Sequence, residues 1–161
     1  MTMGDSWSYK PADKYKSTDE LIKKLVDVVS KGGNFLLNIG PKPDGELDSI
    51  AYNRLAEISA WMKVNGESIY GTRSHTVFGE GDSIRYTQSK DGKTQYIFFL
   101  SPSGKLERLS QMQFDRSTKL QWLGNRGTVA WENAGGKPAI TLPTRPPVLG
   151  SNVIVLKATQ L

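Results

Sequence analysis

The sequence predicts an α/β segment followed by an antiparallel β-sandwich. Two periodicities carry this prediction: apolar residues recur every three or four positions in the first part and alternate with polar residues in the second. The change falls between Gly71 and Ser74, and turn signals built on glycine and aspartate are frequent beyond it. With 161 residues, the chain can form one ordinary domain or two small units.

The first predicted element is a helix that begins after Ser17. The sequence Ser17 to Glu20, STDE, has the form of a capping box, in which the serine and glutamate side chains satisfy free amides of the first turn. Gly32 and Gly33 provide the stop signal. Apolar residues spaced by three and four share one face of this helix: Leu21, Ile22, Leu25, Val28 and Val29. The helix therefore has one side to bury.

Residues 34–39, NFLLNI, form a short apolar run between glycines. Such a run is typical of a strand covered on both faces, as in parallel sheets. The sequence Pro43-Asp44-Gly45 predicts a turn after it, and either Asp48 or Ser49 is expected to cap a second helix that ends at Asn65-Gly66. The apolar stripe of this helix consists of Ala51, Leu55, Ile58 and Met62. The first part thus reads as helix, buried strand, loop and helix.

The second part reads as a series of short strands joined by turns. A tight hairpin is expected at Asp91-Gly92, and residues 144–151, TRPPVLGS, are expected to form a rigid connection. Leu120 alternates with Trp122, and Val129 with Trp131, as in half-buried strands. The predicted strands are residues 83–89, 94–100, 119–123, 128–132, 139–142 and 153–157. An antiparallel sandwich or roll accounts for this pattern.

Composition excludes several classes of function. The chain has no cysteine and a single histidine, His75, so we expect no metal site and no cofactor. The apolar runs are far shorter than the roughly 20 residues of a membrane-spanning helix. The net charge of +5 is scattered along the chain, so we do not expect nucleic-acid binding. The given chain shows no secretory signal peptide, and its compartment stays open.

A series of short motifs runs through residues 1–73: MTMGDSWSY at 1–9, LVDVVSKGGN at 25–34, LLNIGP at 36–41 and WMKVNGESIYG at 61–71. In order and spacing these motifs resemble the α-L-fucosidases of glycoside hydrolase family 29. That family joins a catalytic (β/α) barrel to a C-terminal β-sandwich, and its members are often lysosomal, periplasmic or secreted. The resemblance implies that residues 1–73 are the final strand and helices of the barrel and that residues 74–161 are the sandwich.

The resemblance also implies a function and a site. The family hydrolyses terminal α-L-fucose with retention, so a fucosylated glycan or fucoside is the expected substrate. Trp7 matches a pocket-wall position, and Asn38 lies at the strand end where barrels build their sites. The family's two catalytic carboxylates have no matching position here. Asp5, Asp44 and Glu46 are the only local candidates, and turn and helix-start roles explain Asp44 and Glu46 better.

Alternatives remain open for the second part. Trp122 and Trp131 are expected to fill the sandwich core, or else to form a sugar-stacking platform in a non-catalytic carbohydrate-binding module. An inactive fragment is the other alternative. His75 is expected to be packed or exposed rather than a catalytic base. Because a strand at residues 35–39 without barrel neighbours would expose apolar faces, we expect self-association of the chain or assembly with a missing barrel portion.

Overall fold

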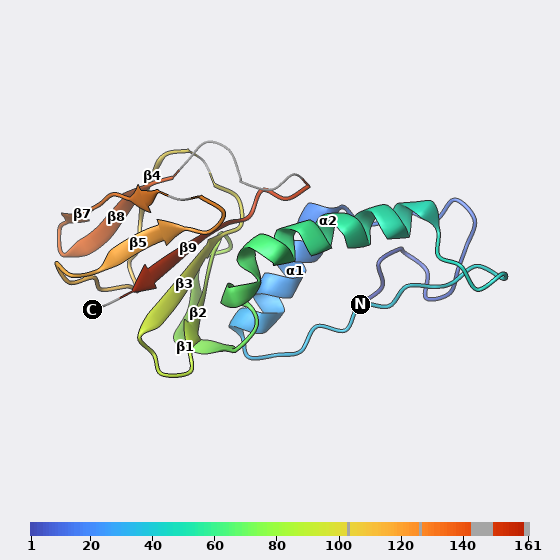
Figure 1. The fold of residues 1–161 in the computed structure, drawn as a ribbon, viewed down its shortest axis with the longest axis horizontal. Coiled ribbons are helices and arrows are strands. Elements are labelled where there is room, and N and C mark those ends of the chain that lie inside the picture. Colours follow the sequence, from blue (N-terminus) through green and yellow to red (C-terminus); the bar gives the residue numbers. More distant parts are fainter. Residues whose placement is uncertain (103, 126, 143–149, 160–161) are drawn as a thin grey trace.

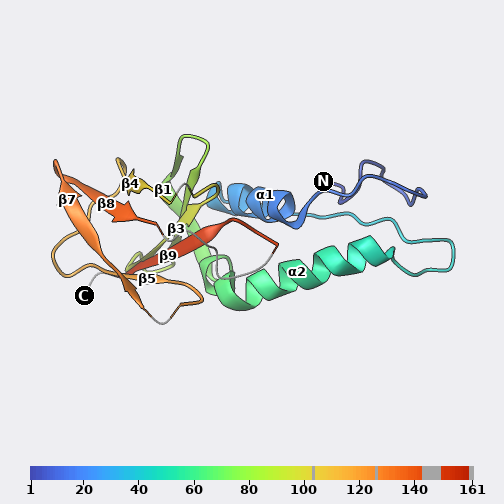
Figure 2. The same cartoon turned by 90° about the horizontal axis from the view of Figure 1, so that it is seen from above.

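The structure is a computed structural model that describes residues 1–102, 104–125, 127–142 and 150–159. It has three layers: a pair of helices, a six-stranded sheet and a three-stranded sheet (Figure 1). The sheets occupy one end of the molecule. The helices extend away from them toward a group of loops at the other end (Figure 2).

Helix α1 spans Thr18–Ser30 and begins as the sequence predicts. Ser17 is the N-cap, and its side-chain oxygen accepts a 3.1 Å hydrogen bond from the Glu20 amide. At the other end, the amide of Gly33 donates to the Val28 carbonyl over 2.9 Å. Leu21, Ile22 and Val26 are buried. Of the predicted apolar face, Leu21 and Ile22 are thus buried, whereas Leu25, Val28 and Val29 are half-buried.

Helix α2 spans Ser49–Asn65 and continues into a 3-10 turn, η1, at Gly66–Ser68. Its N-cap is Asp48, whose carboxylate accepts a 2.9 Å hydrogen bond from the Ile50 amide. The turn predicted before it is present, because the Gly45 amide donates to the Lys42 carbonyl over 2.9 Å.

The larger sheet has the strand order β1-β2-β3-β9-β5-β6, with every pair antiparallel. Hairpin β2–β3 encloses Asp91-Gly92 as predicted, and the Gly92 amide donates to the Ser89 carbonyl over 3.0 Å. Its strands are β1 Thr72–Glu80, β2 Ile84–Ser89, β3 Thr94–Phe99, β5 Lys119–Trp122, β6 Thr128–Val129 and β9 Ile154–Thr159.

The smaller sheet has the order β4-β8-β7, with strands β4 Leu106–Arg108, β7 Trp131–Ala134 and β8 Lys137–Thr141. The predicted strand at residues 128–132 is in fact two strands, β6 and β7, which belong to different sheets. Strands β1 and β4 were not predicted. The connection expected at residues 144–151 lies mostly outside the described residues.

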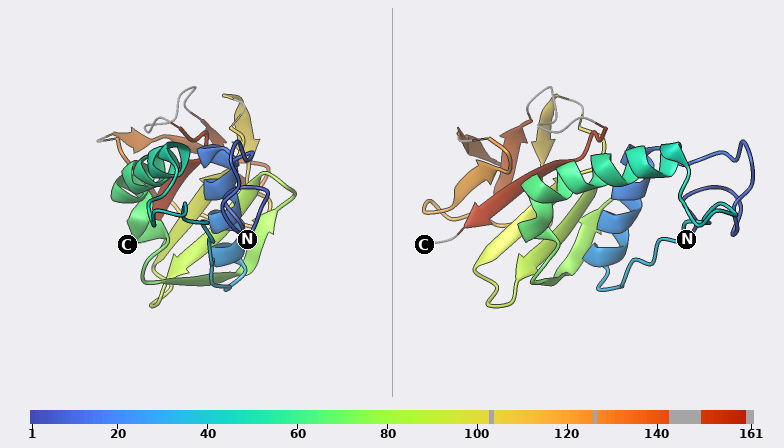
Figure 3. Two further views of the ribbon diagram at one scale, coloured as in Figure 1. Left: turned by 90° about the vertical axis from the view of Figure 1, so that its right-hand side faces the viewer. Right: turned by 45° about the vertical axis from the view of Figure 1, so that its right-hand side comes forward.

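The larger sheet is the middle layer, and an apolar cluster on each of its faces packs it against the layer beside it. On one face, Phe98 and Val155 pack with Ile22 of α1 and Trp61 of α2. Figure 3 shows the two helices side by side over this face. On the other face, a second cluster lies between the two sheets, and it includes Tyr86, Ile97, Phe99, Leu109, Met112, Leu120, Ile140, Ile154 and Leu156. Alternate residues of β3 and β9 thus serve two cores.

The predicted buried strand at residues 34–39 is wrong for this chain. The segment is extended but forms only one isolated bridge, between Thr2 and Asn38, and that bridge is parallel. Leu37 and Ile39 face the helices in a small cluster with Met3. Leu36 is 77% exposed, because nothing in the described chain covers the opposite face. No described helix has the length and apolar character needed to cross a membrane.

Candidate functional site

Two loops meet at the end of the molecule farthest from the sheets (Figures 1 and 2). Each follows one of two parallel segments, residues 1–3 and residues 36–39. These segments are held together by the Met3 amide, which donates to the Asn38 carbonyl over 2.9 Å, and by the Asn38 amide, which donates to the Met1 carbonyl over 2.9 Å. Because the segments run in the same direction, residues 4–16 and 40–48 leave from the same end.

The structure brings the two predicted binding residues, Trp7 and Asn38, into contact. The side-chain amide of Asn38 donates a 2.7 Å hydrogen bond to the carbonyl of Trp7. The indole ring is 70% exposed and is free to meet a ligand. Beside them, a Cβ atom at Gly40 would collide with the backbone of Ser8 and Tyr9, so a glycine is needed for the two loops to approach.

The three candidate carboxylates lie on the surface of the same region. Asp5 is exposed in the first loop. Asp44 accepts a 3.0 Å hydrogen bond from the Glu46 amide and pairs with Lys42 at 3.1 Å. These two interactions lower the pKa of the Asp44 carboxyl, the backbone hydrogen bond contributing most. A lowered pKa suits a turn residue and does not suit a proton donor.

Glu46 is also occupied locally. Its carboxylate accepts a 2.7 Å hydrogen bond from the Tyr52 hydroxyl, and this bond raises the pKa of Tyr52. Both side chains are exposed at the start of α2. The contacts of Asp44 and Glu46 are thus those of a turn and a helix start, and among the described residues no contact of the Asp5 side chain prepares it for catalysis.

Sequence reasoning missed the residues that shape the first loop from inside. The Asp13 carboxylate accepts hydrogen bonds from the amides of Ser6 and Lys14, each at 3.0 Å. The Lys16 ammonium donates to the Gly4 carbonyl over 2.9 Å. Gly4 and Asp13 lie nine positions apart in a segment without periodicity, so no sequence signal joins them.

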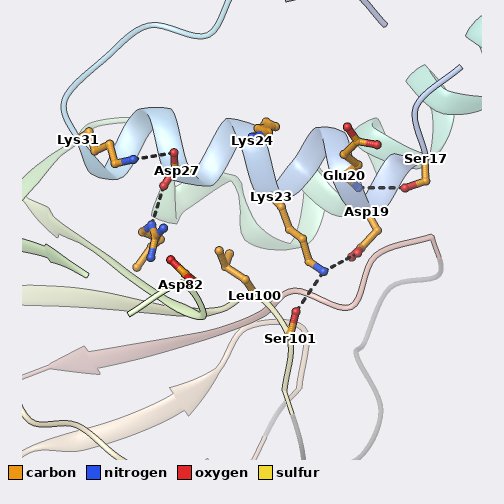
Figure 4. A pocket seen from close by; sticks show the side chains of 11 residues that line it. Ser17, Asp19, Glu20, Lys23, Lys24, Asp27, Lys31, Asp82, Leu100 and Ser101 are labelled. Atoms are coloured by element: carbon orange, nitrogen blue, oxygen red, sulfur yellow. Dashed lines mark hydrogen bonds and ion pairs between the residues drawn. The ribbon is translucent and has the colours of Figure 1, made fainter. Parts of the chain in front are cut away.

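A groove of about 460 Å³ runs between α1 and the larger sheet, and Figure 4 shows that its side chains are largely paired with one another. Lys23 bonds Asp19 at 2.7 Å, and Asp27 bonds Lys31 at 2.8 Å. Asp27 also accepts a 2.7 Å bond from Arg85, a residue of β2 that is only 8% exposed. Burial opposes ionisation of Asp27, but these hydrogen bonds outweigh it and lower its pKa. The ion pair between Asp27 and Arg85 therefore holds α1 to the larger sheet.

In the sandwich, the aromatic residues considered as a sugar platform pack against the core. Trp131 meets Phe114 edge to face with ring centroids 5.2 Å apart, and its indole nitrogen donates to the Thr118 carbonyl over 3.1 Å. Trp122 packs against the same core. His75 is half-buried, with its ring centroid 5.8 Å from that of Tyr86. Within the described residues, no group of three histidine or acidic side chains could hold a metal ion.

The known proteins that this chain resembles are α-L-fucosidases. The family model described as Alpha-L-fucosidase matches residues 1–67. Tissue alpha-L-fucosidase of Rattus norvegicus is 34% identical over 148 residues, which cover 88% of this chain and 32% of the rat protein. An alignment of that length must extend into the sandwich, so the similarity is not confined to the first 73 residues.

Solved structures show the same relationship. The α-L-fucosidase isoenzyme 1 of Paenibacillus thiaminolyticus superposes with a TM-score of 0.84 at 28% identity, covering 99% of this chain and 38% of that one. The Thermotoga maritima α-fucosidase in complex with fucose gives a TM-score of 0.83 at 29% identity, with the same coverage. The chain is thus similar to the C-terminal portion of the α-L-fucosidases of glycoside hydrolase family 29. It spans about a third of the length of the curated relatives it matches.

Proposed function

We propose that this chain forms one side of the fucose pocket of an α-L-fucosidase and that hydrolysis needs barrel elements outside the chain. The observation that carries the proposal is the contact between Asn38 and Trp7, which presents an exposed indole where two parallel segments end. An aromatic ring in that position can pack against the C–H face of a sugar. Barrel enzymes build their sites at this end of their strands.

The contacts of the carboxylates indicate which steps this chain performs and which need residues outside it. Retaining glycosidases use two carboxyl groups about 5 to 5.5 Å apart, one as nucleophile and one as acid and base. Asp44 and Glu46 are occupied by Lys42 and Tyr52 in an exposed loop. We therefore assign binding of a fucosylated substrate to Trp7 and Asn38, and the retaining chemistry to residues outside this chain.

The same reasoning gives a domain assignment. Segments 1–3 and 36–39, joined through α1, form a parallel pair of the kind found in (β/α) barrels. We assign residues 1–73 to the end of the barrel and residues 74–161 to the sandwich. Because Phe98 and Val155 share a cluster with Trp61, the sandwich also supports the helices that carry the site.

A chimera tests the proposal. The matching C-terminal portion of the Thermotoga maritima α-fucosidase is replaced by this chain, and release of 4-nitrophenol from its α-L-fucoside is measured. We expect turnover by the chimera, none by the chain alone, and a KM raised about fivefold or more by Trp7→Ala, since loss of a stacking ring costs about 1 kcal/mol or more. A matched control is Trp131→Ala, which removes a ring from the sandwich core.

Two results would contradict the proposal. One is turnover by the isolated chain, because the catalytic pair would then lie within it. The other is a chimera that folds, as judged by circular dichroism, and hydrolyses the fucoside equally well with and without Trp7. The alternatives, a non-catalytic carbohydrate-binding module or an inactive fragment, predict a folded chimera without turnover.

A further inference from the structure

The indole of Trp7 has little packing of its own to hold it in place. It is 70% exposed, and it belongs to a loop, residues 4–16, that has no helix or strand. An exposed ring can act as a preformed sugar surface only if its backbone is fixed, since ordering it on binding would reduce affinity. The groups that fix this backbone therefore matter for the site.

Two side chains hold the backbone on either side of the Ser6–Trp7 peptide. On one side, Asn38 donates to the Trp7 carbonyl over 2.7 Å. On the other, Asp13 accepts from the Ser6 amide over 3.0 Å, with the Ser6 hydroxyl at 3.5 Å from the same carboxylate. Asn38 belongs to the second parallel segment, whereas Asp13 reaches across from the returning arm of the loop.

The loop is built around the Asp13 carboxylate. Its second oxygen accepts from the Lys14 amide over 3.0 Å, so the carboxylate bridges both arms. A Cβ atom at Gly4 would collide with Asp13 Oδ2, so a larger residue there would displace the carboxylate from this position. Lys16 closes the base of the loop by donating to the Gly4 carbonyl over 2.9 Å. Amide hydrogen bonds to a charged acceptor are stronger than those between neutral groups.

We propose that Asp13 is a positioning residue of the sugar site, which acts through Trp7 by fixing the Asp5–Ser6 peptide, one residue before Trp7. This role rests on the proposed function, because it assumes that Trp7 contacts fucose. The carboxylate itself does not need to touch the sugar. An Asp13→Asn change keeps one acceptor oxygen and is expected to retain part of the effect, whereas Asp13→Ala removes both acceptors.

The first measurement is amide hydrogen exchange of the full chain by NMR. We expect exchange at Ser6 to accelerate at least about tenfold in Asp13→Ala and less in Asp13→Asn, because the loop opens locally. Exchange at Val26 within α1 reports global stability and should not change. Gly4→Ala, which displaces the carboxylate, should act in the same direction, and Lys14→Ala, which keeps the backbone amide, is the matched control.

The second measurement is binding of L-fucose, followed through the indole N–H signal of Trp7 and through backbone signals of residues 36–48. Asp13→Ala should raise the half-saturating L-fucose concentration severalfold when Trp7 is present and have no further effect in a Trp7→Ala background. A merely structural role would not produce this dependence on Trp7.

The outcomes distinguish the positioning role of Asp13 from the proposed fucose pocket. Unchanged exchange at Ser6, or an equal loss of L-fucose binding with and without Trp7, would overturn the positioning role. If L-fucose shifts no signal in the unmodified chain, the side of the pocket that this chain supplies does not bind the sugar alone, and the chimera decides the proposed function. The exchange of Ser6 and the relaxation of the Trp7 indole signal then decide the positioning role by themselves, since increased motion in Asp13→Ala supports it and unchanged motion overturns it.

Discussion

At the residue scale, a polar cluster of the sandwich is centred on Glu80 at the end of β1. Its carboxylate accepts hydrogen bonds from the Tyr86 hydroxyl, from the Ser110 amide at 2.8 Å and hydroxyl at 2.7 Å, and from the Gln111 amide at 2.9 Å. These contacts fix the segment that places Leu109 in the core. Burial opposes ionisation, but the hydrogen bonds outweigh it and lower the pKa of Glu80.

This lowered pKa predicts a pH dependence of stability. The unfolded chain has an ordinary glutamate pKa of about 4.3. Glu80 therefore contributes stability that is fully present above about pH 4.3 and is lost as the pH falls through its lower folded value. We expect Glu80→Gln to reduce the free energy of unfolding by about 1 to 3 kcal/mol at neutral pH, because the neutral amide cannot accept all four hydrogen bonds. As the pH falls, the free energy of unfolding of Glu80→Gln should decrease less than that of the wild type.

Urea denaturation at a series of pH values measures both effects. Asp5→Asn is the control, because that carboxylate is exposed in a distant loop. Parallel stability profiles for wild type and Glu80→Gln would contradict the prediction.

At the element scale, the two N-caps show what local sequence can decide. The sequence left Asp48 and Ser49 as alternative caps of α2, and in the structure Asp48 accepts from the Ile50 amide. We predict that Asp48→Ala lowers the free energy of unfolding by about 1 kcal/mol. Ser49→Ala should change it by less than about 0.5 kcal/mol, as a surface substitution does. Thermal unfolding followed by circular dichroism distinguishes them, and equal effects would count against Asp48 as the cap.

The helices and most strands could be predicted because their signals are local. Strand β1 was missed because TRSHTVFGE lacks regular alternation, and its pairing with β2 shifts register between Ser74 and Gly79. The split at Ala130 was missed because alternation continues from Val129 to Trp131 while the chain passes from one sheet to the other. Both errors concern which strands pair and in which register, and a single sequence does not display this.

The candidate site shows the same limit. The resemblance named Trp7 and Asn38, and the structure joins them through one hydrogen bond. Asp13 could not be found, because its partner amides carry no side-chain signature. The apolar run at residues 34–39 predicted full burial, but Leu37 and Ile39, which face the helices, are half-buried and Leu36 is exposed. Whether a strand is covered on both faces depends on neighbours, not on its own residues.

At the scale of the whole molecule, the exposed side of residues 35–39 has a consequence for assembly. Leu36 is 77% exposed, and a groove lined by Val28, Phe35 and Leu36 lies beside it. One edge of the segment is bonded to residues 1–3, and the other edge has no backbone partner among the described residues. An open edge next to apolar side chains favours pairing with another chain.

We therefore predict that the isolated chain self-associates through this segment. Leu36→Lys should weaken the association about tenfold or more, because a charged residue on an open edge opposes pairing. Ile50→Lys is the matched control, since Ile50 is also an exposed apolar residue but lies on α2, away from the edge. Light scattering and sedimentation velocity over a concentration series measure the effect. A chain that stays monomeric at its highest soluble concentration, or an equal response to both substitutions, would rule out this segment as the contact.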